Sequence, residues 1–263
     1  MVPRILVIAG SDSSGGAGLQ ADLKTAQAFG VYAQTAVTAV TVQDTAKVHS
    51  INPVTPAIVR GQIAAALNDI GADAIKIGML GNGDIAAGVA DALEGTNIPL
   101  VLDTVLLSSS GTPLLDAAGM EILKARLIPR ATLVTPNLPE VQALTGIMPD
   151  SEHRLRNAAM AFKMLGCDHV LFKGGHGTDD TVRDVLWSGG AFIAIEAPRQ
   201  QRRHTHGTGC TLATAIACGL AQKLSLNDAV ARAHAYVQEA IRTAPGLGSG
   251  NGPLNHQVPP QKS

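Results

Sequence analysis

Short apolar segments alternate with longer amphipathic ones along the 263 residues of this chain. The predicted strands cover residues 4–9, 34–42, 74–77, 100–103, 132–135 and 169–173. Helical patterns lie between them, with end signals such as Thr55-Pro56 at the start of one helix and Gly71 at its end. Such alternation is typical of βαβ units. It predicts an α/β fold in which helices cover both faces of a mostly parallel central sheet.

Two segments depart from this alternation. Residues 182–187 and 192–196 flank a Ser-Gly-Gly turn and predict a small antiparallel hairpin at one edge of the sheet. The last segment, 246–263, is rich in Gly, Pro and Asn and predicts a loop followed by a mobile tail. The sequence has neither an internal repeat nor a linker between two cores, so we expect a single domain over residues 1–263.

Composition argues against several function classes. Hydrophobic residues make up 46% of the chain and charged residues 16%, which is typical of a globular protein. The formal net charge is -1 and aromatic residues are 3%, so we expect binding to neither nucleic acid nor an anionic membrane. The apolar runs are far shorter than the roughly 20 residues of a membrane span. Three cysteines without a C-x-x-C pair, and a first strand with no leader before it, predict a cytoplasmic protein.

A glycine-rich loop, Gly10-Ser-Asp-Ser-Ser-Gly-Gly-Ala-Gly18, follows the first predicted strand. Ligands of doubly wound sheets bind at the carboxyl ends of the strands. Glycines there let backbone N–H groups approach a ligand closely. The loop matches neither a Walker A loop nor G-x-G-x-x-G. Its spacing alone is equally compatible with a flexible turn.

A second glycine motif, Thr205-His-Gly-Thr-Gly-Cys-Thr211, precedes an apolar run of small residues. Glycines directly before a helix form a nest of backbone donors at the positive end of that helix, where a phosphoryl group would be held. Cys210 would lie in the first turn, a position that lowers the pKa of a thiol. A tight turn before a buried helix is the alternative, and the density of glycine favours the anion site.

Further polar residues follow other predicted strands. Asn137 and Glu140 lie three residues apart where a helix begins and could share an Mg²⁺ site, although a helix cap gives the same pattern. Lys173 stands beside glycines and could either reach a phosphate or lie on the surface of a turn. Asp103 is compatible with a metal ligand, a base or a helix cap.

Together these segments resemble the hydroxymethylpyrimidine/phosphomethylpyrimidine kinases of thiamine biosynthesis, members of the ribokinase-like superfamily. The resemblance covers residues 5 to about 256. It rests on the glycine-rich loop continued to Thr25, Lys76-Ile-Gly-Met-Leu80, Val134-Thr-Pro-Asn-Leu-Pro-Glu140, Lys173-Gly-Gly-His176, Thr205-His-Gly-Thr-Gly-Cys-Thr211 and Gly252-Pro-Leu-Asn-His256. It implies a ribokinase-like three-layer αβα sandwich, a homodimer and a kinase reaction that requires Mg²⁺. In that reaction ATP phosphorylates 4-amino-5-hydroxymethyl-2-methylpyrimidine and then its monophosphate.

The resemblance also implies a role for each candidate residue. The pyrimidine would be bound by Gln43, Gly10, Asp22 and Met79, with Gln43 pairing to the aminopyrimidine edge. The anion hole would be formed by Gly207, Thr208, Gly209 and Cys210. ATP would be bound by Lys173 and Thr205, and Mg²⁺ by Glu140, Asn137 and Asp103. The Cys210 thiol could also accept the proton of the substrate hydroxyl, a role that an Asp has in the sugar kinases.

Four positions depart from the commonest family pattern: Ser109, His204, His234 and Asn251 stand where Lys, Asn, Lys and His are usual. They are expected on the nucleotide or product side and affect its detail more than the reaction. Two other functions stay open, a pyridoxal or pyridoxine kinase of the same fold and a catalytically silent pyrimidine-binding regulator. The Gln43 amide, which can pair with both an amine and a ring nitrogen, favours the pyrimidine. The complete nucleotide half argues against a silent regulator.

Overall fold

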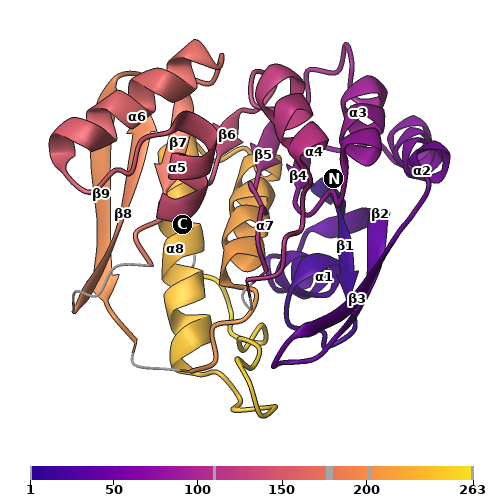
Figure 1. The fold of residues 1–263 in the computed structure, drawn as a ribbon. Coiled ribbons are helices and arrows are strands. Elements are labelled where there is room, and N and C mark those ends of the chain that lie inside the picture. The colour runs from indigo at the N-terminus through magenta and orange to yellow at the C-terminus, as the bar shows by residue number, and fades with distance from the viewer. Residues whose placement is uncertain (1, 109–110, 176–179, 201–202, 262–263) are drawn as a thin grey trace.

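The computed structural model describes residues 2–108, 111–175, 180–200 and 203–261. Its strands are β1 (Arg4–Asp12), β2 (Tyr32–Gln43), β3 (Val48–Pro53), β4 (Ala74–Ile77), β5 (Leu100–Leu102), β6 (Leu133–Val134), β7 (His169–Phe172), β8 (Thr181–Ser188) and β9 (Ala191–Pro198). Within the described residues they form one nine-stranded sheet in the order β3-β2-β1-β4-β5-β6-β7-β8-β9 (Figure 1). The pairs from β2 to β7 are parallel, whereas β3, β8 and β9 pair antiparallel with their neighbours.

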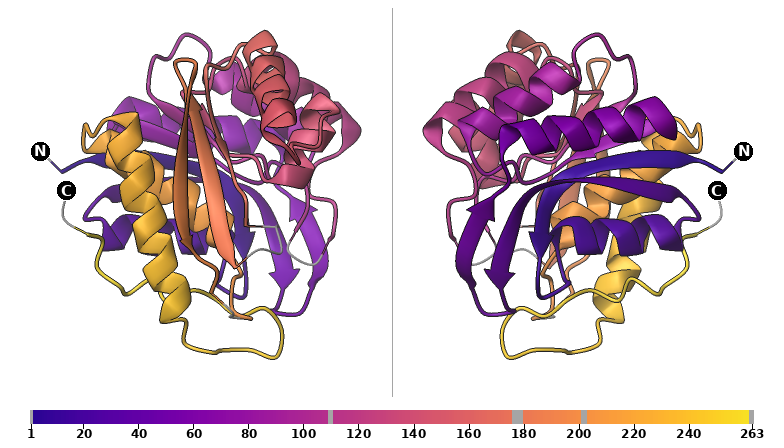
Figure 2. Two further views of the ribbon diagram at one scale, coloured as in Figure 1. Left: turned by 90° about the vertical axis from the view of Figure 1, so that its left-hand side faces the viewer. Right: turned by 90° about the vertical axis from the view of Figure 1, so that its right-hand side faces the viewer.

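Helices cover both faces of this sheet (Figure 2). One face carries α1 (Gly18–Ala28), α7 (Thr208–Ala221) and α8 (Leu226–Arg242). The other carries α2 (Pro56–Asp69), α3 (Gly83–Ala92), α4 (Ala117–Ile122), the π-helical turn η1 (Leu123–Leu127), α5 (Leu138–Thr145) and α6 (Glu152–Met164). Successive residues of β1 point to opposite faces and are fully buried, with Ile5 and Val7 in the first layer and Leu6 and Ile8 in the second. The predicted α/β sandwich is confirmed.

The two edges of the sheet differ from each other. At one edge the predicted hairpin is confirmed, because β8 and β9 pair along their whole length. At the other edge β3 pairs with β2, a strand that the sequence pattern does not predict. The residues of β3 are half-buried or exposed, so no apolar alternation marks it. Helix α4 is also unpredicted, although its N-cap Asp116 accepts a bond from Gly119 N–H (2.7 Å).

The C-terminal segment after α8 has neither a helix nor a strand as far as residue 261, as predicted. Part of it is nevertheless packed on the molecule, since Leu254, His256 and Val258 are buried. The hydroxyl of Tyr236 in α8 donates to the carbonyl oxygen of His256 at 3.1 Å. Residues 252–258 are therefore anchored on α8, which corrects the expectation of a mobile tail for this stretch.

The carboxyl ends of the parallel strands meet at one edge of the sheet, where α7 also begins. There β2 ends at Gln43, and β4, β5 and β7 end just before Gly78-Met79, Asp103 and Lys173. Residues far apart in the sequence are thereby gathered at one place, as expected for a ligand site in a parallel sheet. In the part of the chain that the structure describes, no helix combines the length and apolar character needed to cross a membrane.

Candidate active site

Asp12 orders the glycine-rich loop that follows β1. Its buried carboxylate accepts bonds from the N–H groups of Ser14 (2.8 Å), Gly16 (3.2 Å) and Ala17 (2.8 Å), and from Ser14 Oγ (2.9 Å). Burial raises the pKa of Asp12, but hydrogen bonds from His206, Ser14 and Ala17 outweigh it and hold this pKa below its usual range. The loop is therefore ordered around an ionised acceptor and is not a flexible turn.

Two glycines bring backbone segments of the site into direct contact. Gly18 has φ +52°, and a Cβ there would collide with the carbonyl oxygen of Gly10. Gly207 has φ +87° and caps α7, and a Cβ there would collide with the carbonyl oxygen of Gly16. Only glycine satisfies both the conformation and the contact. The loop before α7 therefore lies against the glycine-rich loop.

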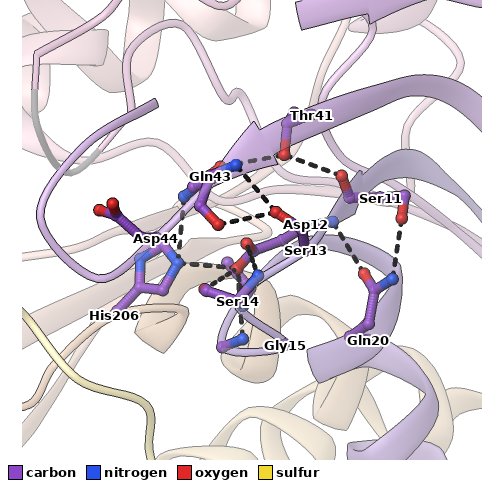
Figure 3. A network of polar contacts seen from close by, with 12 residues as sticks. Ser11, Asp12, Ser13, Ser14, Gly15, Gln20, Thr41, Gln43, Asp44 and His206 are labelled. Carbon is purple, nitrogen blue, oxygen red and sulfur yellow. Dashed lines mark hydrogen bonds and ion pairs between the residues drawn. The ribbon is translucent and has the colours of Figure 1, made fainter. Parts of the chain in front are cut away.

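Gln43 lies where β2 ends, within the polar network of Figure 3. Ser13 holds its backbone, because Ser13 Oγ donates to the Gln43 carbonyl oxygen (2.7 Å) and accepts from the Gln43 N–H (2.8 Å). The side-chain amide has Oε1 3.4 Å from Thr41 Oγ1 and Nε2 3.2 Å from His206 Nε2. His206 Nε2 in turn lies 2.8 Å from Asp12 Oδ2. The half-buried amide thus has partners on both sides and a remaining edge for a ligand.

Gly10 and Met79 are in contact at the ends of β1 and β4. A Cβ on Gly10 would lie 2.8 Å from Met79 Sδ, so a larger residue would displace the thioether. Met79 is buried, and Thr38 Oγ1 donates to its carbonyl oxygen at 2.6 Å. Gly10 also interrupts the pairing of β1 with β2, whose register shifts between Ala9 and Ser11. Two of the predicted substrate-binding residues are thus brought together beside β2.

Asp22 lies deeper than a substrate-binding residue would. It is fully buried, with Lys76 Nζ 3.0 Å from its Oδ1 and 2.9 Å from its Oδ2, while Thr214 Oγ1 donates to Oδ1 at 2.6 Å. Lys76 is also fully buried; burial lowers its pKa, but Asp22, Cys210 and Asp103 raise it above its ordinary value. Asp22 is therefore the charge partner of Lys76 beneath the site and presents no surface to a substrate.

Cys210 lies in the first turn of α7, as predicted, but its pKa is shifted in the opposite direction from the one expected. Burial raises the pKa of the Cys210 thiol to about 11. Lys76 lowers this pKa, whereas Asp22 and Asp103 raise it further. The helix N-terminus does not make this thiol acidic, which corrects the sequence-based expectation. The thiol is protonated at neutral pH.

The first turn of α7 supplies backbone donors for an anion. Its N-cap is Gly207, and Thr208 N–H donates to the carbonyl oxygen of Thr205 at 3.3 Å. Thr208 Oγ1 donates to the same oxygen at 2.7 Å. The backbone bonds of the described residues leave the N–H groups of Gly209 and Cys210 for a ligand. The predicted nest therefore rests on these two donors at the positive end of the helix.

Lys173 and Asp103 lie beside this turn. Lys173 Nζ is 2.9 Å from Asp103 Oδ1, to which Thr135 Oγ1 also donates at 3.2 Å. A Cβ on Gly209 would lie 3.4 Å from Lys173 Nζ and 3.6 Å from Asp103 Oδ2. Burial lowers the pKa of Lys173, but Asp103 and Glu140 raise it above its ordinary value. A charged ammonium therefore stands next to the anion nest.

Asn137 and Glu140 form a capping box at the start of α5. Asn137 Oδ1 accepts from Glu140 N–H (2.9 Å), and Glu140 Oε2 accepts from Asn137 N–H (2.8 Å) and from Thr104 Oγ1 (3.0 Å). Burial raises the pKa of Glu140; Lys173 lowers it in part and Asp103 raises it. The helix-cap interpretation of this motif is thus confirmed by the bonds.

Asp103 and Glu140, the two carboxylates that interact with Lys173, suit a hard cation. Glu140 uses Oε2 and Asp103 uses Oδ1 for the bonds just described, so each has a second oxygen outside them. Mg²⁺ is bound by one or two carboxylates together with waters and substrate phosphates. The described residues contain no group of three or more His, Cys, Asp or Glu placed to hold a metal. Waters and phosphate oxygens would therefore complete the coordination.

The four positions that depart from the family pattern have different surroundings. Ser109 lies outside the described residues. His204 Nδ1 accepts a bond from the backbone of the C-terminal segment at 3.1 Å. Asn251 lines a cavity of about 20 Å³ beside the end of β2, together with Gln43 and His206. His234 is buried on α8 with Nε2 3.9 Å from Asp184 Oδ2.

Three side chains of the site, Asp12, Lys76 and His206, are absent from the sequence-based assignment. Lys76 could have been identified from the sequence, because a Lys within the apolar segment 74–77 needs a buried partner of opposite charge. Asp12 and His206 carry no local signal, because their contact joins positions 194 residues apart.

Residues 12–255 match the family model described as phosphomethylpyrimidine kinase. The chain belongs to this family. It is 46% identical to the hydroxymethylpyrimidine/phosphomethylpyrimidine kinase of Streptomyces coelicolor over 254 residues, 97% of this chain and 94% of that one. It is similar to the structure of Bacillus subtilis pyridoxal kinase in an ADP complex (TM-score 0.89, 32% identity, 97% of this chain, 98% of that one). It is also similar to a phosphomethylpyrimidine kinase of Clostridium difficile 630 (TM-score 0.80, 36% identity, 92% of this chain, 100% of that one).

Fold similarity does not separate pyrimidine kinases from pyridoxal kinases, since the TM-score is higher for the pyridoxal kinase. Identity to the solved structures does not separate them either, at 36% for the Clostridium pyrimidine kinase and 35% for a Staphylococcus aureus pyridoxal kinase. The curated relatives favour the pyrimidine kinases, since identity is 46% to the enzyme of Streptomyces coelicolor and 42% to that of Bacillus subtilis. In this member of the phosphomethylpyrimidine kinase family, the contact of Gly16 with Gly207 joins the glycine-rich loop after β1 to the first turn of α7.

Proposed function

We propose that this protein uses ATP to phosphorylate 4-amino-5-hydroxymethyl-2-methylpyrimidine and then its monophosphate, supplying the pyrimidine diphosphate for thiamine biosynthesis. The observation that carries the proposal is the backbone contact of Gly16 with Gly207. It brings the glycine-rich loop, whose Ser13 holds the backbone of Gln43, against the turn that begins α7 and carries the N–H groups of Gly209 and Cys210. A flat ring that is bound on one edge by an amide can then present its hydroxymethyl group to an anion site.

The recognition half of the site is assigned to the residues around the end of β2. The Gln43 amide has both a donor and an acceptor, which matches an exocyclic amine next to a ring nitrogen. Gly10 and Met79 form a close-packed wall on which the ring would lie. Asp22 acts from beneath, by keeping Lys76 charged under the anion nest.

The phosphoryl half of the site stabilises charge. The N–H groups of Gly209 and Cys210 would bind the transferring phosphoryl group, and Lys173 would bind an ATP phosphate. Phosphoryl transfer depends mainly on alignment and on donors aimed at developing charge. Because the Cys210 thiol has a pKa of about 11, we assign the main contribution of this residue to its backbone N–H.

Mg²⁺ is the cofactor that the remaining residues fit. The free oxygens of Asp103 and Glu140 would hold the ion through water molecules, whereas Asn137 contributes by fixing Glu140 through the capping box. When bound, the ion neutralises negative charge on the phosphates of ATP. Thr205 contributes through its carbonyl oxygen, which holds the first turn of α7.

An ADP-release assay tests the proposal. We expect ADP with the aminopyrimidine and with its monophosphate, and little with pyridoxal or pyridoxine. Turnover of pyridoxal without turnover of the pyrimidine would establish the pyridoxal kinase alternative. Binding of the pyrimidine in calorimetry without any ADP would establish the silent regulator instead.

We also propose that the chain acts as a single cytoplasmic domain and as a homodimer. The continuous sheet over the described residues supports one domain. Light scattering coupled to size-exclusion chromatography tests the dimer, and a mass of about one chain at micromolar concentration would exclude it.

A further inference from the structure

The contact between Gln43 and His206 has a chemical conflict. Gln43 Nε2 lies 3.2 Å from His206 Nε2, and this His206 nitrogen lies 2.8 Å from Asp12 Oδ2. An ionised carboxylate only accepts hydrogen bonds, so His206 Nε2 must carry the proton in that pair. Asp12 is ionised, because its pKa is held below the usual range even though burial raises it. An amide NH₂ therefore faces an N–H, and two donors cannot bond.

A second conflict lies on the other side of the same amide. Thr41 Oγ1 is 2.9 Å from the carbonyl oxygen of Ser11 and 3.4 Å from Gln43 Oε1. A hydroxyl has one proton, and the shorter contact with Ser11 takes it. Thr41 Oγ1 therefore offers lone pairs to Gln43 Oε1, so that two acceptors face each other (Figure 3).

A half-turn of the Gln43 amide removes both conflicts. The carbonyl oxygen then faces His206 Nε2–H, which is shared between Asp12 Oδ2 and Gln43 Oε1, and the NH₂ faces Thr41 Oγ1. Each amide atom can then form one more hydrogen bond with a ligand, because Oε1 has a second lone pair and Nε2 has a second proton. The acceptor of the Gln43 edge is thus on the His206 side and the donor is on the Thr41 side.

We propose that His206, held by Asp12, is a positioning residue that fixes the Gln43 amide in this orientation and thereby sets which ring edge the site accepts. The inference rests on the proposed pyrimidine substrate. A 4-aminopyrimidine presents an amine donor next to a ring-nitrogen acceptor, which matches the fixed amide. The 4-oxo counterpart presents a carbonyl acceptor next to a ring N–H, which is the reverse pattern. Discrimination between them requires that the amide cannot turn.

His206 is well placed for this role because its ring is clamped between loops. It is 6% exposed, and a Cβ on Gly16 would lie 2.6 Å from its Cδ2. Its backbone N–H donates to the Gly252 carbonyl oxygen at 3.1 Å. Because the ring is fixed and its partner Asp12 accepts four other bonds, the N–H direction is fixed as well.

The test compares affinities for the 4-amino substrate and for 5-hydroxymethyl-2-methylpyrimidin-4-one by calorimetry without ATP, using displacement titration for the weaker ligand. His206→Phe keeps the ring volume but removes the N–H. We expect its ratio of the two affinities to fall about tenfold or more relative to wild type, because the amide can then turn to match either ligand. His206→Gln places an N–H near the former Nε2 position and should restore most of the ratio.

Two further variants separate positioning from loop damage. Ser14→Ala removes the Ser14 Oγ bond to Asp12 (2.9 Å) and loosens the same loop without touching the amide. It should weaken both ligands equally and keep the ratio. Thr41→Val removes the acceptor for the amide NH₂ and should lower the ratio several-fold, which keeps the test decisive if His206→Phe does not fold.

The outcomes distinguish the inference from the proposed function. If wild type binds the 4-amino ligand and both His206→Phe and Thr41→Val keep its ratio within about twofold, the positioning role is refuted and the function stands. If the two variants lower both affinities in parallel, His206 has a merely structural role and the inference fails. If wild type does not bind the 4-amino ligand, the proposed function and the inference fall together.

Discussion

The two halves of the site are built from different interactions. Around Gln43, a neutral amide is held in a network of hydrogen bonds with loop residues, and the buried carboxylate of this network, Asp12, has a lowered pKa. Under and beside α7, the groups are charged and paired, as in Asp22 with Lys76 and Asp103 with Lys173. In the proposed function, hydrogen bonds would give the first half its selectivity for a ring edge, while the second half would have to tolerate large changes of phosphate charge.

This difference predicts how each half responds to substitution. Removing one partner of a buried ion pair leaves an uncompensated charge and costs about 3–5 kcal/mol. Removing one partner of a neutral hydrogen bond costs about 1–3 kcal/mol. We therefore expect substitutions in the charged half to reduce stability and substitutions in the amide half to reduce affinity.

The largest expected effect is that of Lys76→Met. Asp22 would stay fully buried without its cation, and we expect the free energy of unfolding to fall by about 3–5 kcal/mol. Urea titration followed by circular dichroism measures this change. The double variant Lys76→Met/Asp22→Leu should recover most of the loss, and the exposed Lys47→Met is the matched control. A loss below about 1 kcal/mol would show that the pair is not needed for stability.

The next effect concerns the thiol of Cys210. Because its pKa is about 11, the reactive thiolate is scarce at neutral pH, and the alkylation rate should rise about tenfold per pH unit, or about a hundredfold from pH 7 to pH 9. Cys167 and Cys218 are buried, so iodoacetamide labelling followed by mass spectrometry should report Cys210. Cys210→Ala is the control for site assignment. A rate that is already at its plateau at pH 7 would show an acidic thiol, as the helix-terminus argument predicts from sequence.

In the amide half, Gln43→Ala should weaken binding of the aminopyrimidine by about 1–3 kcal/mol, because the polar edge of the ring loses its partner. The middle of this range corresponds to a roughly thirtyfold loss of affinity. The affinity for ATP and the free energy of unfolding should change little. Calorimetry with each ligand measures the separation. Asp44→Asn, an exposed neighbour that lines the same small cavity, is the matched control. Equal losses of affinity for the aminopyrimidine and for ATP would contradict the prediction that Gln43 binds only the pyrimidine ring.

The sequence predicts the fold well wherever a strand or helix has a buried face. Strands such as β1 and β4 are buried on both faces, and α2 begins at the predicted Thr55-Pro56, with Thr55 as its N-cap. The pattern fails for β3, which pairs at the edge and buries no face. Its existence depends on β2 as a partner, and hydrophobic periodicity does not encode that partner.

The site is predictable to the level of motifs and no further. The glycine motifs identify both loops, because a positive φ at Gly207 and a close backbone approach require this residue. The burial of Asp22 and the raised pKa of Cys210 follow from how α1, β4 and α7 pack together. Desolvation outweighs the helix terminus at Cys210, and only the packed structure determines how much solvent is lost.

The smallest expected effect is in the dependence on Mg²⁺. Glu140→Gln keeps the shape of the side chain and an oxygen that can accept from Asn137 N–H and Thr104 Oγ1. It removes one charge from the proposed water-mediated shell. We expect the Mg²⁺ concentration for half-maximal activity to rise about three- to tenfold, with a smaller change at saturating Mg²⁺. The exposed Glu121→Gln is the matched control.

The pH dependence sharpens this last comparison. Burial raises the pKa of Glu140 in the folded protein, so the native state keeps a proton at pH values where the unfolded chain has released it. The stability that this proton contributes is fully present below the pKa of Glu140 in the unfolded chain. It is lost as the pH rises through the pKa of Glu140 in the folded protein. Wild type should therefore need more Mg²⁺ as pH falls into this window and the carboxylate is neutralised, whereas Glu140→Gln should show no such rise. Identical Mg²⁺ titrations for the two proteins across this range would remove Glu140 from the metal site and leave it only as the cap of α5.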